Sequence, residues 1–318
     1  MGRQHEDYLE LFNRIDFEKI KDHPNILIAA NFWGNDRYMA ARTFYRFMRS
    51  IDDLIDNHKS AHQRFSIDEK EQYSKDVQHW LEIIRNSGKE NSLHKDLMDT
   101  MARFRIPLWP LEAFAKSMVY DIHHDGFTTI HQFLDYASGA SVAPASIFVH
   151  LCGIREDDGQ YLPPLFDVRE AAIPCAIFSY LVHIIRDFQK DQFNNLNYFA
   201  DEILDKNGLN RKDLKRIAET GDVPYGFRMV IKEYHTLAEQ YREKTCNMIR
   251  TIWPYLEPRY QLSLEVIFNL YLMVFERISP EAGMFTSDEL NPSTSETRSR
   301  VLETVRNFNG EQINCVKY

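Results

Sequence analysis

Glycine and proline are scarce in this sequence, with 12 of each among 318 residues, while 44% of the residues are apolar. Both residue types interrupt helices, and the rest of the composition is rich in helix formers such as Leu, Ala, Glu and Lys. No stretch rich in Gly, Ser or Pro divides the chain into parts. The sequence therefore predicts an all-α protein with a single domain.

Positive charge is also limited. Lys and Arg number 38 against 47 Asp and Glu, and the net charge is −9. No basic tract stands out, which argues against nucleic acid as a partner. The N-terminus lacks the apolar region of a signal peptide, and no run reaches the ~18 apolar residues of a membrane span. We expect a soluble, cytoplasmic protein with no transmembrane segment, whose contact with a membrane would be peripheral.

The four cysteines lie far apart, at Cys152, Cys175, Cys246 and Cys315. None belongs to a C-x-x-C motif, and their spacing does not match a zinc finger. We expect reduced thiols.

Apolar residues recur at helical spacing through most of the chain. Turn signals such as Asp125-Gly126 and Asn207-Gly208 separate the periodic stretches. The helices are expected within 26–56, 70–86, 93–104, 110–123, 130–152, 168–192, 212–219, 225–253 and 258–279. We divide the chain into an N-terminal segment (1–24), a helical domain (25–286) and a C-terminal tail packed loosely on that domain (287–318).

Two short acidic segments carry the clearest chemical signal. Asp52 and Asp56 are four residues apart, and so are Asp187 and Asp191. In a helix this spacing places both carboxylates on one face, about 6 Å apart along the axis, where they repel each other unless a cation lies between them. Mg²⁺ takes oxygen ligands and usually binds through one or two carboxylates plus substrate phosphates, and Mn²⁺ is an alternative. Two such faces predict a clamp on a diphosphate.

Other polar residues share the helix face of the first pair. At 100° per residue, Tyr45, Arg49, Asp52 and Asp56 fall within about 60° of one another, whereas Asp53 lies about 80° away from this stripe. A phenol, a guanidinium and two carboxylates are therefore expected to face one cavity.

Polar residues also share the helix face of the second aspartate pair. His183, Asp187 and Asp191 form an i, i+4, i+8 stripe, with Tyr180 and Arg186 close to it. We expect the two acidic faces to oppose each other across a helical bundle.

Five segments in this order resemble the squalene and phytoene synthase family, the head-to-head prenyl synthases with the isoprenoid synthase fold, a helical bundle around a central cavity. The resemblance covers residues 25–286. The similar segments are Tyr45-Arg-Phe-Met-Arg49-Ser-Ile-Asp52-Asp53-Leu-Ile-Asp56 (first aspartate-rich motif), Met118-Val-Tyr-Asp121-Ile (M-x-x-D-L), Phe133-Leu-Asp-Tyr136-Ala-Ser-Gly-Ala-Ser (Y-C-Y-x-V-A-G), Ile184-Ile-Arg186-Asp187-Phe-Gln-Lys-Asp191-Gln (second motif) and Leu270-Tyr271-Leu-Met-Val-Phe-Glu-Arg-Ile (last cavity helix).

This resemblance implies a role for each matching residue. The four aspartates of the two pairs would hold Mg²⁺ ions that bridge the diphosphates of two prenyl substrates. The metal ions and Arg49 would draw off diphosphate and leave an allylic cation, which the double bond of the second chain attacks. Tyr45, Tyr136 and Arg186 would also be catalytic. The implied substrate-binding residues are Asp53, Asp121, Tyr180, His183, Tyr198 and Tyr271.

Several positions depart from the family pattern. Some of the missing groups would bind diphosphate, and each charged hydrogen bond to phosphate is worth about 1.5–3 kcal/mol. The sequence thus leaves open the complete two-step reaction or ionisation and first coupling alone. The departures are Tyr180 and His183 for Gln and Asn, Lys190 for Glu, Asn195-Leu196 for Gly-Arg, Gly126 for a loop Arg, Asn25-Ile-Leu for Ser-Phe-Tyr, and Ala140-Ser-Val-Ala-Pro144-Ala for V-A-G-x-V-G.

Our first interpretation is a Mg²⁺-dependent prenyltransferase that couples two prenyl diphosphates, farnesyl rather than geranylgeranyl, to a presqualene, squalene or phytoene type of product. The alternatives are a hydrolase or a cyclase-like lyase acting on one prenyl diphosphate. A non-catalytic subunit is disfavoured because both Asp pairs are present. A di-iron bundle is excluded because the sequence has no E-x-x-H. Use of NADPH, a homodimer and a partner enzyme of the same pathway stay open.

Overall fold

The computed structural model describes residues 2–19, 24–62, 65–85, 92–311 and 313, and nearly all of its regular structure is helical. The elements in chain order are α1 (Gly2–Arg14), α2 (Pro24–Ala30), α3 (Asn35–His62), α4 (Ile67–Arg85), α5 (Ser92–Phe104), α6 (Trp109–His123), α7 (Ile130–Ala137), the π-helical turn η1 (Ser138–Val142), α8 (Ala143–Gly153), the antiparallel strands β1 (Arg155–Asp157) and β2 (Gln160–Leu162), α9 (Val168–Arg186), α10 (Phe188–Phe193), α11 (Asp201–Lys206), α12 (Arg211–Thr220), α13 (Tyr225–Ile252), the 3₁₀ turn η2 (Trp253–Tyr255), α14 (Pro258–Phe275), α15 (Ser287–Leu290) and α16 (Thr294–Asn307).

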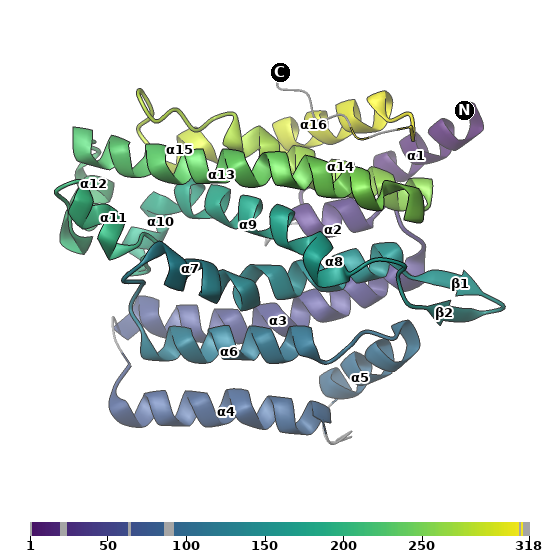
Figure 1. Cartoon of the computed structure of the whole chain (residues 1–318), viewed down its shortest axis with the longest axis horizontal. Helices are drawn as coiled ribbons and strands as arrows, with labels where there is room; N and C mark the ends of the chain where they lie inside the picture. The colour runs from purple at the N-terminus through teal and green to yellow at the C-terminus, as the bar shows by residue number, and fades with distance from the viewer. Residues whose placement is uncertain (1, 20–23, 63–64, 86–91, 312, 314–318) are drawn as a thin grey trace.

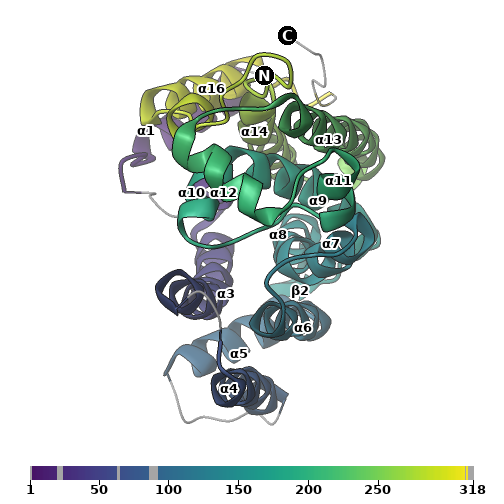
Figure 2. The ribbon, with the colours of Figure 1, turned by 90° about the vertical axis from the view of Figure 1, so that its left-hand side faces the viewer.

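The long helices lie side by side along the longest axis of the molecule (Figure 1). Helices α3, α4 and α6 form one side of the bundle, α13, α14 and α16 form the other, and α9 runs between them. The short helices α10–α12 gather at the end of the bundle where α9 finishes (Figure 2). The β1–β2 hairpin projects from the opposite end.

Helix α9 is the central helix of the bundle and packs against α8, α13 and α14. Asp167 caps its N-terminus, since the side chain accepts hydrogen bonds from the backbone N–H groups of Arg169 and Glu170 at 2.9 and 3.0 Å. In the described part of the chain, α9 alone is long and apolar enough for a membrane span, a feature that the sequence reading overlooked. Because 61% of its apolar window is buried inside the protein, the composition fits a core helix.

Three expected helices are interrupted. The stretch 26–56 is divided by a turn at residues 31–34, and the stretch 130–152 contains the π-helical turn η1. The stretch 168–192 breaks at Asp187, whose φ of −90° and ψ of 2° separate α9 from α10. The backbone N–H of Asp191 still donates to the carbonyl of Asp187 at 2.8 Å, so the second aspartate pair keeps its one-turn spacing.

The π-helical turn depends on a very close approach to α6. A Cβ atom on Gly139 would lie 2.1 Å from the carbonyl oxygen of Ala113 and 2.2 Å from Oγ of Ser117. That hydroxyl also donates to the carbonyl of Tyr136 at 2.7 Å. Glycine at this position therefore lets η1 pack on α6 and fixes the backbone that carries Tyr136.

The C-terminal part of the chain is more ordered than the sequence suggested. Helix α16 begins with a capping box between Ser293 and Glu296, and it packs against α1 and α14. Val301 and Val305 on this helix are fully buried. The expectation of a loosely packed tail is wrong for residues 294–307.

The cysteines differ in state. Cys246 is disulfide-bonded, so the expectation of reduced thiols is wrong for this residue. Cys152 and Cys175 are free, and burial raises the pKa of the Cys175 thiol to about 12, which keeps it protonated and unreactive. Cys315 lies outside the described residues.

Candidate active site

A cavity of about 910 Å³ lies within the bundle, walled by α3, η1, α8, α9, α13 and α14. Its size is within the range of small-molecule sites, about 300–1,000 Å³. Charged side chains gather where α3 and α9 finish, and much of the remaining lining is apolar. The apolar lining includes Phe44, Met48, Phe114, Ile147, Phe148, Leu151, Ile249, Ile252, Leu264, Ile267, Leu270, Met273 and Val274.

The site residues expected from the sequence line this cavity, with the exception of Asp121. They come from three parts of the chain that are distant in sequence. The lining residues are Tyr45, Arg49, Asp52, Asp53 and Asp56 of α3, Tyr136 of α7, and Tyr180, His183, Arg186, Asp187, Asp191, Tyr198 and Tyr271 from α9 onward.

Arg49 is held among the carboxylates of α3. Its Nη1 lies 2.9 Å from Oδ2 of Asp52 and its Nη2 lies 2.5 Å from Oδ1 of Asp53. Burial raises the pKa of Asp52 despite this guanidinium. Burial and the charges of Asp52 and Asp121 raise the pKa of Asp56 still further. This face of α3 therefore holds its negative charge at a cost that a bound cation would offset.

On the opposite wall, Arg186 forms a bidentate pair with Asp187, from Nε to Oδ1 at 2.8 Å and from Nη2 to Oδ2 at 2.7 Å. Burial by itself would raise the pKa of Asp187, but these hydrogen bonds outweigh it and lower the pKa. For Asp191, burial together with the charges of Asp187 and Asp56 raises the pKa well above its usual value. The influence of Asp56 on Asp191 places the two acidic faces within electrostatic reach of each other across the cavity.

Asp121 lies behind the α3 face and not in the cavity lining. Its Oδ1 accepts a hydrogen bond from Nζ of Lys59 at 2.6 Å, and both side chains are buried. Lys59 also donates to the carbonyl of His124 at 3.1 Å. Sequence spacing alone did not indicate this buried ion pair, and the role of Asp121 in substrate binding stays a prediction.

Aromatic residues form the wall beside the acidic faces. The rings of Tyr136 and Tyr180 are 6.3 Å apart, and those of Tyr180 and Tyr198 are 6.1 Å apart. Burial raises the pKa of all three phenols well above that of free tyrosine, so they are hydrogen-bonding groups and not bases. Tyr271 lies edge-on to His183 at 5.3 Å, and burial raises its pKa to about 12.

Several lining residues were missed by sequence reasoning. Ser179 and Asn25 partly offset the rise that burial causes in the pKa of Tyr271, and Asn25 of α2 replaces part of the family's Ser-Phe-Tyr. The segment assigned to the tail also contributes to the wall. Its lining residues are Ser287, Asn291, Pro292, Thr294 and Thr297. The S-x-x-E signature of the capping box at Ser293 could have revealed the helix there.

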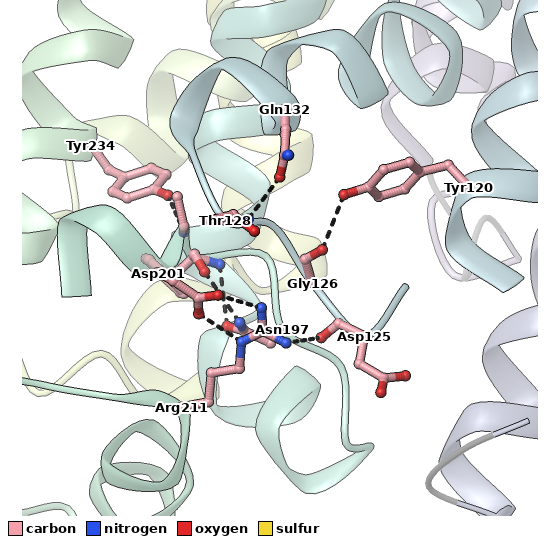
Figure 3. A network of polar contacts seen from close by, with 11 residues as sticks. Tyr120, Asp125, Gly126, Thr128, Gln132, Asn197, Asp201, Arg211 and Tyr234 are labelled. Carbon is pink, nitrogen blue, oxygen red and sulfur yellow. Dashed lines mark hydrogen bonds and ion pairs between the residues drawn. The ribbon is translucent and has the colours of Figure 1, made fainter. Parts of the chain in front are cut away.

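A polar network holds the segment that carries Tyr198 (Figure 3). Arg211 at the start of α12 forms a bidentate pair with Asp201, at 2.7 and 2.6 Å, and donates to the carbonyl of Asp125 at 2.9 Å. The N–H of Asp201 donates to the carbonyl of Phe127 at 2.9 Å. The loop after α6 and the segment before α11 are thereby joined.

Gly126 lies at the centre of this network with a φ of +145°, which side chains rarely adopt. A Cβ atom there would lie 3.0 Å from Cζ of Arg211. The guanidinium of Arg211 thus occupies the space beside the position at which the family usually has arginine. Arg211 is bound by Asp201 and does not line the cavity.

Arg211→Ala is expected to lower the free energy of unfolding by about 1–2 kcal/mol, because it leaves the partly buried Asp201 without its bidentate partner. Urea unfolding measures this change. Arg211→Lys keeps the charge but loses the planar fork, so we expect an intermediate loss. Equal stability of wild type and Arg211→Ala would contradict the role of this network.

No group of three or more Asp, Glu, His or Cys side chains is close enough to form a metal site by itself within the described ranges. The acidic faces do fit an ion that takes its other ligands from water and phosphate, as Mg²⁺ usually does. Such an ion would bind together with a phosphorylated substrate.

An all-α bundle with opposed acidic faces around a central cavity is the isoprenoid synthase fold. The squalene/phytoene synthase family model matches residues 23–296. The chain therefore belongs to the squalene/phytoene synthase family and is a prenyltransferase of this type, a class that condenses prenyl diphosphates head to head.

Solved structures share this fold at low sequence identity. A ligand-bound dehydrosqualene synthase has a TM-score of 0.71 at 15% identity over 95% of this chain and 98% of its own. The squalene synthase HpnC from Alicyclobacillus acidocaldarius has a TM-score of 0.60 at 14% identity, over 83% and 90%. YisP from Bacillus subtilis subsp. subtilis strain 168 has a TM-score of 0.58 at 14% identity, over 93% and 97%. No curated protein sequence matches the chain.

Proposed function

We propose that this protein is a Mg²⁺-dependent enzyme that couples two molecules of farnesyl diphosphate head to head and releases diphosphate. The observation that carries this proposal is the arrangement of the cavity. Two carboxylate faces oppose each other at its polar end, and much of the remaining lining is apolar. A prenyl diphosphate has the matching division into a charged head and an apolar chain.

Asp52 and Asp56 on α3 and Asp187 and Asp191 on the opposite wall would hold the Mg²⁺ ions. The ions would neutralise diphosphate as the bond between carbon and oxygen breaks and the leaving group takes the electron pair. The raised pKa values of Asp56 and Asp191 support this assignment, because a cation between these carboxylates would remove their mutual repulsion.

The chain's own residues would orient the substrates and protect the cation. Arg49 lies on the same face as Asp52 and would bind the leaving diphosphate. The phenols of Tyr136, Tyr180 and Tyr198 present neutral oxygen atoms and aromatic faces to the cavity. The apolar interior excludes water, so the allylic cation is attacked by the double bond of the second chain, and loss of a proton completes the new carbon skeleton.

Farnesyl is preferred over geranylgeranyl as the chain. Two structural neighbours are named dehydrosqualene synthase and squalene synthase, and squalene contains two C15 units. The segment Arg186-Asp-Phe-Gln-Lys190-Asp-Gln is also closer to the squalene branch.

The test is incubation of the purified protein with farnesyl diphosphate and Mg²⁺, with and without NADPH, followed by mass spectrometry of the organic extract. We expect a C30 product that disappears when EDTA removes the metal. Comparison of the incubations with and without NADPH distinguishes an enzyme that stops at a presqualene type of product from one that reduces it to squalene. Geranylgeranyl diphosphate is the matched control substrate.

Two results would overturn this proposal. Farnesol or a C15 hydrocarbon alone would show that the cavity is used for hydrolysis or cyclisation of one chain. A C40 product formed faster than the C30 product would show that geranylgeranyl is the substrate.

A further inference from the structure

The polar end of the cavity carries more negative than positive charge. Five aspartates of the two motifs line it, against the cations Arg49, Arg186 and Lys190. Both arginines are engaged: Asp52 and Asp53 bind Arg49, and Asp187 binds Arg186 through two hydrogen bonds. A diphosphate entering here meets arginines whose charge is already shared with carboxylates.

Lys190 differs from these arginines. It lies on α10, three residues after Asp187 and next to Asp191, with an exposed side chain at the edge of the cavity. Its charge favours the ionised form of both aspartates, which places the ammonium near them. Within the described parts of the chain, its side chain forms neither a hydrogen bond nor an ion pair. The ammonium of Lys190 is therefore left for a ligand, whereas Nη1 and Nη2 of Arg49 and Nε and Nη2 of Arg186 are held by aspartates.

We propose that Lys190 binds the diphosphate group of the prenyl substrate on the α9–α10 side of the cavity. This inference rests on the proposed function and adds a substrate-binding residue to it. A lysine ammonium is a compact point charge on a flexible stem, with three donors for phosphate oxygens. It would supply positive charge close to Asp187 and Asp191, where Leu196 offers none.

Lys190 can be substituted without damage to the fold, so its role in diphosphate binding can be tested directly. The side chain of Lys190 is exposed, and its loss would leave no hydrogen-bond or ion-pair partner unsatisfied among the residues that the structure describes. Substitutions there should leave the unfolding transition of the ligand-free protein unchanged. Lys212 on α12 is a matched control, because it is also exposed but does not line the cavity.

The experiment compares Lys190→Met, Lys190→Glu and Lys190→Arg with Lys212→Met in the full chain. The first readout is the affinity for inorganic pyrophosphate in the presence of Mg²⁺, measured by isothermal titration calorimetry. The second is the division of any activity loss between KM for farnesyl diphosphate and kcat. We expect about tenfold weaker pyrophosphate binding in Lys190→Met, a larger loss in Lys190→Glu, and a change below about threefold in Lys190→Arg and Lys212→Met.

Pyrophosphate has no prenyl chain, so its binding does not depend on which reaction the enzyme performs. Lys190-dependent binding without a C30 product supports the role of Lys190 and overturns the coupling of two chains. A C30 product with wild-type pyrophosphate affinity and KM in Lys190→Met overturns the role of Lys190 alone. The role is also overturned if wild type does not bind pyrophosphate, or if Lys212→Met weakens binding as much as Lys190→Met.

Discussion

Asp52→Ala is expected to lower Mg²⁺-dependent release of diphosphate by about 10³-fold or more. The carboxylate lies at the polar end of the cavity beside Arg49 and Asp56, and burial, together with the charges of other aspartates, raises its pKa, a penalty that a bound metal ion would offset. Loss of one group that stabilises transition-state charge typically costs 10²–10³-fold in turnover, and here loss of a bound metal ion would add to that. Asp187→Ala should act similarly from the opposite wall.

The measurement is the rate of pyrophosphate release from farnesyl diphosphate at saturating Mg²⁺. Asp53→Ala is the control within the same motif, because the Asp53 side chain also pairs with Arg49 but is 44% exposed, against 32% for Asp52. We expect a loss of less than about tenfold there, since exposed ion pairs contribute little. Wild-type turnover in Asp52→Ala or Asp187→Ala would end the assignment of these residues as metal ligands.

Gly139→Ala is expected to lower the free energy of unfolding by about 3 kcal/mol or more. The new methyl group would lie 2.1 Å from the carbonyl oxygen of Ala113, a backbone atom that cannot move without shifting α6. Overpacking of a buried contact usually costs about 1–3 kcal/mol, and a clash with backbone belongs at the upper end. Because η1 begins two residues after Tyr136, the folded fraction should also lose activity.

Urea unfolding measures this effect, with Gly34→Ala as the matched control. A Cβ atom on Gly34 would have Arg259 as its nearest neighbour at 4.0 Å, so this variant should stay within about 0.5 kcal/mol of wild type. The double variant Gly139→Ala with Ser117→Ala removes the contact at 2.2 Å but leaves the carbonyl clash. Full recovery in the double variant, or no loss in the single one, would show that the π-helical turn can move away from α6.

Local periodicity predicted the helices well wherever one face is apolar and the ends carry turn residues. Helix α12 shows why, since a capping box at Asn210 begins it and Gly221 in the left-handed conformation ends it. The same reasoning missed the π-helical turn η1 and the break between α9 and α10 at Asp187. The apolar pattern continues through both irregularities, so periodicity does not reveal them.

The candidate site was predicted in part. The face of α3 was found because Asp52 and Asp56 are one helical turn apart, a relation that is local in sequence. The ion pair between Lys59 and Asp121 was missed because its members are 62 residues apart and lie on separate helices. The disulfide bond of Cys246 was missed for the same reason, since spacing along the chain does not report distance in space.

Helical spacing and short motifs depend on neighbours within a few residues, so the amino-acid sequence was sufficient to predict the helical class, the two acidic faces and the resemblance to prenyl synthases. The folded structure was needed to show that Asp56 influences Asp191 across a cavity and that Asp121 pairs with Lys59 behind the cavity wall. It was also needed to show that aspartates bind both arginines, whereas Lys190 has no ion-pair partner among the described residues. These features depend on how distant helices pack and which buried charges meet, and packing is set by the whole chain together.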